Sequence, residues 1–305
     1  MESKSYYPKV YNINPTLKYL SSAPPIPGYQ DFIGTYLLNG DTKALFDVGP
    51  KASIPGLLSA LSQAGVSPAE IGYIILSHIH IDHAGGVGMA VREMKNARVV
   101  VHERGRPHLV DPTVLWKSSV EVLGQAALNY GSYDPVPDNR IVSAEEGMHI
   151  DLGQGIVLEI YLTPGHAAHH LSVFDRKDSV LLAGDSAGVY TNGFLRLTTP
   201  PQFRIGDYMK SLDKMLALHP VKLGYAHFGC YDDAVKRLDD IRKKVYLWYE
   251  IAQSAIKEGK TDEEIIRLIR AKDKTLDIFD KLDRDTYGRE YLLLLNSVRG
   301  LMTAK

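Results

Sequence analysis

Cysteine is almost absent from this sequence, and Cys230 is its single example in 305 residues. One thiol excludes an internal disulfide framework and any zinc site built from several thiolates. Any metal that the chain binds would therefore have to be held by nitrogen and oxygen atoms.

An excess of charge of either sign is also lacking. Thirty-five basic residues oppose thirty-six acidic ones, and the formal net charge at pH 7 is -1. No overall field draws such a chain to nucleic acid or to an anionic membrane. We therefore expect a small-molecule substrate and no nucleic-acid partner.

Long apolar runs are missing as well. No stretch reaches the roughly 20 apolar residues that a membrane span needs, and residues 1–10 contain no apolar core of signal-peptide length. We expect a cytoplasmic protein with no membrane partner. Hydrophobic residues make up 45% of the chain and charged residues 23%, which is ordinary for a chain that folds around a core.

Strand and helix patterns alternate through most of the chain. Residues 32–38 and 44–48 are β-type runs joined by the turn Asn39-Gly40-Asp41, which predicts a hairpin. The proline-rich residues before them have the composition of an irregular surface arm. Further strands are predicted at 71–76, 98–101, 156–162, 171–174, 180–183 and 223–225, and helices at 53–64, 87–95 and 208–218. This alternation is typical of an α/β fold.

The pattern weakens between about residues 107 and 138, where several prolines surround one expected helix at 114–128. We interpret this stretch as an insertion or lid. Its aromatic residues Trp116, Tyr130 and Tyr133 are candidates for substrate contacts.

Past Cys230 the β signal ends. Apolar residues three or four apart, from Val235 to Ile256, predict a long helix that Gly259 can terminate. Two more helices are expected, one after the capping box of Thr261 and Glu264 and one at 287–302. The chain thus divides into a larger α/β domain, 1–230, and a helical C-terminal extension, 231–305. The apolar faces of the extension could pack on the domain, cover the edge of the site or join a homodimer, and packing is the reading we favour.

The run His78-Ile79-His80-Ile81-Asp82-His83 follows directly on the strand predicted at 71–76. Side chains alternate in an extended segment, so His78 and His80 project to one side and can reach one metal ion. Imidazole and carboxylate are ligands that zinc accepts in catalytic sites. A lone histidine is more often structural, but so many ionisable groups would be costly to bury unpaired.

Three further fragments each place one potential ligand just beyond a predicted strand. These residues are His166 in Thr163-Pro164-Gly165-His166, Asp185 in Ala183-Gly184-Asp185-Ser186, and His227 in Ala226-His227-Phe228-Gly229. Taken singly, each could equally be a cap, a turn or a surface residue. Their shared position at strand ends favours a common site.

Taken together, the six-residue run and the three later ligands resemble the metal signature of the metallo-β-lactamase superfamily, over about residues 32–229. The resemblance implies a four-layer αβ/βα sandwich. It also implies that His78, His80 and His166 hold a first metal, that Asp82, His83 and His227 hold a second, and that Asp185 bridges them. Residues 163–172 and 33–49 look most like the glyoxalase II and lactonase branch.

The resemblance implies a metal-dependent hydrolase that uses a metal-activated water on a thioester or lactone carbonyl, with Asp82 and Asp185 as catalytic residues. Two zinc ions are the expected cofactors, although the same ligands suit iron, manganese or nickel. Alternatives are a persulfide dioxygenase-like enzyme with one iron, a phosphodiesterase or RNA-processing nuclease, and a binding module without activity. A serine mechanism is disfavoured because no Gly-x-Ser-x-Gly elbow occurs.

Overall fold

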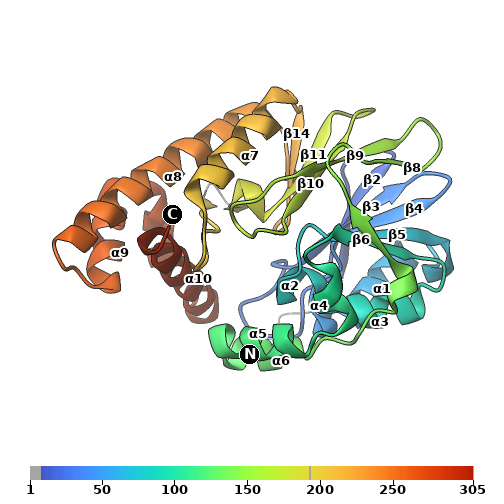
Figure 1. Ribbon diagram of the computed structural model, residues 1–305, viewed down its shortest axis with the longest axis horizontal. Helices are drawn as coiled ribbons and strands as arrows, with labels where there is room; N and C mark the ends of the chain where they lie inside the picture. Colours follow the sequence, from blue (N-terminus) through green and yellow to red (C-terminus); the bar gives the residue numbers. More distant parts are fainter. Residues whose placement is uncertain (1–7, 192–193, 305) are drawn as a thin grey trace.

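A computed structural model describes residues 8–191 and 194–304. Two β-sheets face each other and helices cover their outer surfaces (Figure 1). Residues 1–7, part of the segment weighed above for a signal sequence, lie outside the described residues.

The first sheet has seven strands in the order of the sequence. Its strands are β1 (Lys9–Asn12), β2 (Leu17–Ser21), β3 (Gly34–Asn39), β4 (Lys43–Phe46), β5 (Ile71–Ile75), β6 (Arg98–His102) and β7 (Ile141–Ala144). The strands from β4 to β7 pair in parallel. Parallel strands are normally buried on both faces, so this half of the sheet lies in the interior.

The second sheet has six strands in the order β15-β14-β11-β10-β9-β8. Its strands are β8 (His149–Asp151), β9 (Val157–Leu162), β10 (Leu171–Asp175), β11 (Val180–Gly184), β14 (Lys222–Tyr225) and β15 (Cys230–Tyr231). A separate hairpin of β12 (Val189–Thr191) and β13 (Phe194–Arg196) stands beside it.

The core has three principal layers of contact. Phe46 and Ile75 from the first sheet meet Ile160 and Leu182 from the second between the sheets. The outer layers are formed by helices, which are α1 (Ile54–Gln63) and α3 (Val87–Glu93) on the first sheet and α7 (Ile205–Ala217) and α8 (Ala234–Lys257) on the second. The predicted four-layer αβ/βα sandwich is therefore confirmed.

The predicted irregular arm before residue 32 is wrong in part. Residues 9–12 and 17–21 form a hairpin that extends the first sheet, and β2 pairs antiparallel with β3. Leu17, Tyr19 and Leu20 are buried there. β2 forms because β3 offers it a hydrogen-bonding partner at the edge of the sheet. The local composition of residues 9–21 does not reveal such a partner.

The lid was predicted as one helix and is two. α5 (Thr113–Leu123) and α6 (Gln125–Tyr130) follow the short α4 (Arg106–Val110), and Gly124 separates them with a φ of 54°. A positive φ is readily adopted only by glycine, so the break falls there. α5 buries none of its residues.

The helical extension consists of α8, α9 (Asp262–Lys272), a 3-10 segment at Lys274–Lys281, and α10 (Arg284–Met302). The capping box of α9 is confirmed, because Thr261 Oγ1 accepts from Glu264 N at 3.4 Å and Glu264 Oε2 accepts from Thr261 N at 2.8 Å. Within the described residues, no helix combines the length and apolar content that crossing a bilayer requires.

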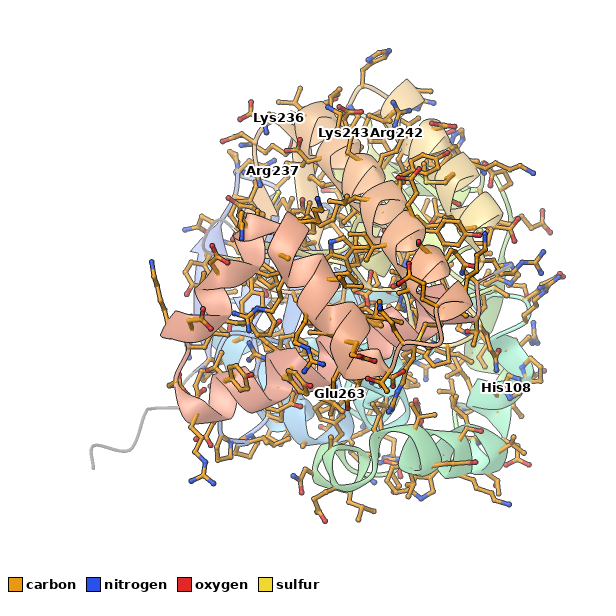
Figure 2. All side chains as sticks on the ribbon, turned by 90° about the vertical axis from the view of Figure 1, so that its left-hand side faces the viewer. His108, Lys236, Arg237, Arg242, Lys243 and Glu263 are labelled. Carbon is orange, nitrogen blue, oxygen red and sulfur yellow. The ribbon has the colours of Figure 1, made fainter. Side chains whose placement is uncertain are left out.

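The apolar stripe of α8 faces inward. Leu238, Ile241 and Trp248 are buried in one cluster with Leu223 of the second sheet, whereas Val235 is 40% exposed. The opposite face carries the basic side chains of Lys236, Arg242 and Lys243, which are labelled in Figure 2. All three pair with aspartates, as Lys236 does with Asp240 at 2.6 Å, so this is a solvated helix face.

Candidate metal centre

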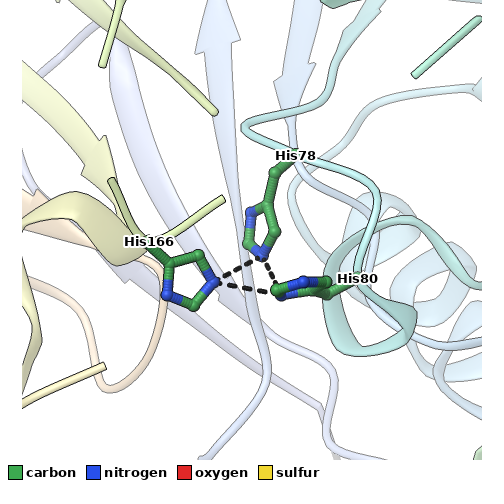
Figure 3. A group of neighbouring side chains, drawn as sticks. All are labelled: His78, His80 and His166. Atoms are coloured by element: carbon green, nitrogen blue, oxygen red, sulfur yellow. Dashed lines mark hydrogen bonds between the residues drawn. The ribbon is translucent and has the colours of Figure 1, made fainter. Parts of the chain in front are cut away.

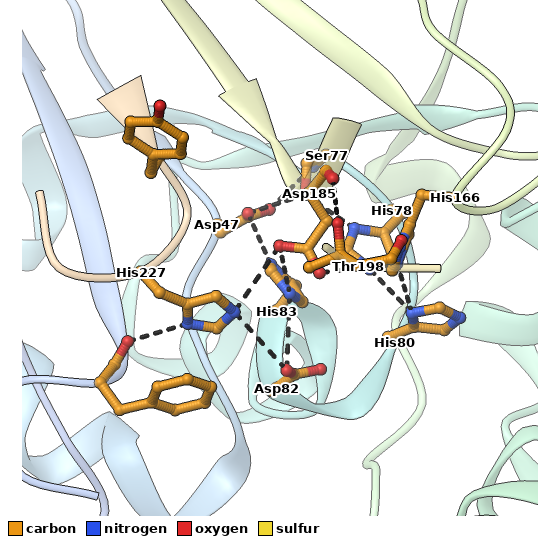
Figure 4. A network of polar contacts seen from close by, with 12 residues as sticks. Asp47, Ser77, His78, His80, Asp82, His83, His166, Asp185, Thr198 and His227 are labelled. Atoms are coloured by element: carbon orange, nitrogen blue, oxygen red, sulfur yellow. Dashed lines mark hydrogen bonds and ion pairs between the residues drawn. The ribbon is translucent and has the colours of Figure 1, made fainter. Parts of the chain in front are cut away.

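The seven predicted ligands gather at one edge of the two sheets, although they come from four separate loops. His78 and His80 follow β5, and Asp82 and His83 lie on the single turn of α2 (Ile81–Ala84). The other loops follow β9, β11 and β14 and supply His166, Asp185 and His227. Figure 4 shows all seven side chains converging.

A first group consists of three histidines (Figure 3). His78 Nε2 lies 2.9 Å from His80 Nδ1, and His166 Nε2 lies 3.2 Å and 3.0 Å from these same atoms. Nitrogens that share a tetrahedral zinc, with bonds of about 2.0 Å, stand roughly 3.3 Å apart. The three ring nitrogens would therefore need to move apart only slightly to bind one ion.

The tautomer of His166 supports this fit. Its Nδ1 donates to the carbonyl oxygen of Thr198 at 2.7 Å, so its Nε2 presents a lone pair to the other two rings when the ring is neutral. Lone pairs converging on one point in a buried site repel unless a cation lies among them.

The second group contains Asp82, His83 and His227. Asp82 Oδ2 lies 3.6 Å from His83 Nε2 and 3.8 Å from His227 Nε2. His227 Nδ1 donates to the carbonyl oxygen of Phe32 at 2.8 Å, so its Nε2 also presents a lone pair.

Asp185 lies between the two groups. Its Oδ2 is 3.6 Å from His166 Nε2 in the first group. Its Oδ1 is 3.6 Å from His227 Nε2 and 3.7 Å from His83 Nε2 in the second. Asp185 Oδ1 and His83 Nε2 are buried and have no hydrogen-bond partner. Buried polar atoms are normally satisfied, and a bound cation would satisfy both.

Asp47 orients one histidine of each group, and it is not among the site residues predicted from the sequence. Its Oδ2 accepts from Ser77 Oγ at 2.7 Å and lies 3.0 Å from His83 Nδ1. Ser77 Oγ in turn lies 2.9 Å from His78 Nδ1. One carboxylate thus orients two candidate ligands. The only available signal was an acidic residue near the end of the β-type run predicted at 44–48.

His170 performs a similar task for Asp185. Its Nε2 accepts from the Asp185 backbone N–H at 3.1 Å, and its Nδ1 lies 2.8 Å from Thr163 Oγ1 and 2.9 Å from Ser186 Oγ. Because its ring nitrogens are used in this way, His170 braces the loop after β11 rather than facing the cluster.

Burial disfavours a positive charge on the histidines of the site, whereas nearby carboxylates favour one. Burial, with the neighbouring imidazoles, holds the pKa of His78 and of His80 well below the usual range. Burial also works against a charge on His83, but the facing carboxylates of Asp82 and Asp185, with Asp47, raise the pKa of His83 to about 10. The positive charge that these carboxylates favour is therefore confined to His83, since burial holds the pKa of His227 below the usual value.

The lid packs directly on this loop. Tyr130 and Tyr133 are buried against Ile81, and Trp116 packs on them from α5 while remaining partly exposed. Tyr133 also donates from its hydroxyl to the Ile79 carbonyl oxygen at 3.1 Å. The predicted pocket aromatics thus cover the histidine run.

Comparison with known proteins identifies the family of the chain. Residues 30–227 match the model of the metallo-beta-lactamase superfamily. A metallo-beta-lactamase fold-containing protein of Sulfurisphaera tokodaii is 36% identical over 184 residues, which are 56% of this chain and 69% of that protein. A probable metallo-hydrolase of Bacillus subtilis is 23% identical over 300 residues, covering 90% of this chain and 88% of the relative.

Solved structures show the same fold. The Sulfolobus tokodaii archaeal superfamily protein superposes with a TM-score of 0.65 at 30% identity, covering 75% of this chain and 86% of that one. A Thermus thermophilus family protein superposes with a TM-score of 0.69 at 21% identity over 95% and 93% of the two chains. The chain belongs to the metallo-beta-lactamase superfamily, as its motifs predicted.

Proposed function

We propose that this chain is a metal-dependent hydrolase that cleaves a thioester or lactone at its carbonyl group. The observation that carries the proposal is the pair of facing ligand groups that share the buried Asp185. Membership of the superfamily supports the hydrolytic class, and the choice of an acyl carbonyl rests on the sequence resemblance described above.

In this proposal, His78, His80 and His166 would hold a first metal, and Asp82, His83 and His227 would hold a second. Asp185 lies between the two groups and could contribute to both. Nitrogen and oxygen ligands of this kind suit zinc, and also iron, manganese or nickel. When bound, the ions would supply a water of lowered pKa and an electrophile for the substrate carbonyl oxygen.

The two catalytic carboxylates have different surroundings. The side chain of Asp185 is 7% exposed, whereas that of Asp82 is 22% exposed. Asp82 can therefore reach both solvent and the ligand edge, and we assign it the role of orienting the attacking water and accepting its proton. Asp185 lies between the two ligand groups and would fix their spacing.

The protein fixes these groups before substrate arrives. His166 and His227 are locked by backbone carbonyl acceptors, and Asp47 locks His83. Such preorganisation lowers the reorganisation needed in the transition state. The lid aromatics Trp116 and Tyr130 would exclude water and contact the acyl portion of the substrate.

The test is metal analysis of the full chain purified without added metal, combined with turnover assays on thioesters, lactones, phosphodiesters and persulfides. We expect close to two equivalents of a divalent metal and turnover of a thioester or lactone. Bound iron with oxygen uptake on a persulfide would overturn the hydrolase assignment. Turnover confined to phosphodiesters would overturn the substrate class.

A further inference from the structure

The C-terminal helix α10 carries two buried charged residues that the proposed mechanism does not use. Arg289 and Glu290 are 6% and 3% exposed, and both belong to a network with Arg196 of β13, which is 2% exposed. Arg196 and Arg289 are the only buried side chains of arginine or lysine in the part of the chain that the structure describes.

Glu290 joins the two arginines. Its Oε2 accepts from Arg196 Nε at 2.8 Å, and its Oε1 accepts from Arg289 Nη2 at 2.8 Å and from Arg289 Nε at 3.1 Å. Apolar residues of similar volume are often as stable as a buried ion network. A positional role is therefore a better explanation for this network than stability.

The guanidinium of Arg289 lies among aromatic rings next to the metal centre. Its Cζ is 4.6 Å from the ring centre of Phe32 and 5.5 Å from that of Phe228. It also donates to the carbonyl oxygen of Gly28. Contacts of this kind between a cation and an aromatic face are attractive, and more so when water is excluded.

Phe32 and Phe228 both adjoin His227. The ring of Phe32 stacks on the imidazole with centroids 4.0 Å apart and an angle of 12° between planes. The carbonyl oxygen of Phe32 also accepts from His227 Nδ1 at 2.8 Å. Phe228 follows His227 directly and has a φ of 65°, which is unusual for a bulky residue. Arg289 therefore contacts both supports of one candidate ligand.

We propose that Arg289, anchored by Glu290, is a positioning residue that fixes His227 through Phe32 and Phe228, so that α10 helps to build the second metal site. This inference rests on the proposed metal-dependent function and extends it to the helical extension. The first group does not depend on Arg289, because His78 is held through Ser77 and Asp47, and His166 is held by the carbonyl oxygen of Thr198. Loss of Arg289 should therefore affect the two metal equivalents unequally.

The experiment titrates the metal-free, full-length protein with Co²⁺ and follows ligand-field absorption, which reports each bound equivalent without any turnover assay. For Arg289→Met we expect affinity for the second equivalent to fall roughly 10–100-fold, as for other residues that orient metal ligands, with the first equivalent unchanged. Arg289→Lys keeps the charge and should restore part of the affinity. The Arg196–Glu290 pair remains neutral in both variants, so the fold should persist.

The matched control is Arg299→Gln. Arg299 lies on the same helix, but its guanidinium pairs with Asp262 at 2.7 Å and its side chain is 51% exposed. This variant should bind both equivalents as the wild type does.

Four outcomes are decisive. Wild-type affinity for both equivalents in Arg289→Met would overturn the positioning role, and so would an equal loss of both. If Arg289→Met does not fold, Arg289→Lys must show the selective loss in weaker form, and unchanged binding in that variant overturns the proposal. A wild-type protein that binds no Co²⁺ would instead contradict the proposed function itself.

Discussion

The ligand edge and the lid above it are built in opposite ways. At the edge, the seven candidate ligands converge and buried hydrogen bonds orient several of their rings. In the lid, α5 buries none of its residues, and Val114 and Val122 are 64% and 59% exposed. The candidate ligands are thus held firmly in place, whereas the outer part of the lid at α5 is loosely packed and can vary.

The largest effect should come from Asp185. Asp185→Ala removes the carboxylate shared by the two ligand groups, and we expect lower metal content and loss of turnover with the fold intact, because the edge is outside the main core. Metal analysis, steady-state kinetics and circular dichroism check this. Asp213→Ala, which removes a carboxylate 63% exposed, is the control. Full activity in Asp185→Ala would eliminate the shared role.

The next largest effect should come from Glu290, the carboxylate that joins the buried Arg196 and Arg289. Burial opposes the charge of Glu290, but Arg196 and Arg289 hold the pKa of its carboxyl below the usual value. A lowered folded-state pKa stabilises the protein above the unfolded-state value of about 4.3 and is lost as pH falls through the folded-state value. Glu290→Gln should cost about 3 to 5 kcal/mol near pH 7, because two buried arginines lose their partner.

The same difference should shrink as the solution becomes acidic. Urea unfolding of the wild type and of Glu290→Gln at several pH values between 7 and 3 measures it. A constant difference across this range would show that the charge of Glu290 does not stabilise the fold.

Asp47 should show an intermediate effect. In Asp47→Asn, one amide group would have to replace a carboxylate that accepts from Ser77 N, from Ser77 Oγ and from His83. We expect metal affinity to fall roughly 10–100-fold. Unlike the loss of Arg289, this change should weaken both equivalents, since Asp47 supports a histidine of each group. A selective effect on one equivalent would contradict that reading.

The smallest effect on chemistry should come from the lid. Trp116→Ala removes an aromatic side chain that packs over the ligand loop, and we expect KM to rise several-fold with little change in kcat or metal content. Val122→Ala on the same helix, at an exposed position, should leave both constants unchanged. A large fall in kcat for Trp116→Ala would mean that the lid takes part in the chemistry as well as in binding.

The sequence alone determined the fold class and brought out the seven ligand candidates, because both depend on local patterns. Apolar periodicity marks strands and helices, and ligands placed directly after strands meet at one sheet edge. The capping box of Thr261 and Glu264 could be predicted for the same reason, because it depends only on residues close together in the sequence. The hairpin of residues 9–21 and the short strands β7, β8 and β15 were missed, since a few residues carry too little periodicity without their partners.

Only the tertiary structure decided how the ligands are held. Asp47 reaches His83 across 36 positions of sequence, and His227 is fixed by a carbonyl oxygen 195 positions away. Arg289 belongs to a helix that looked like a separate appendage, yet it contacts the ring that stacks on His227. Such contacts depend on packing between distant segments and on backbone atoms that every residue shares, so no local pattern announces them.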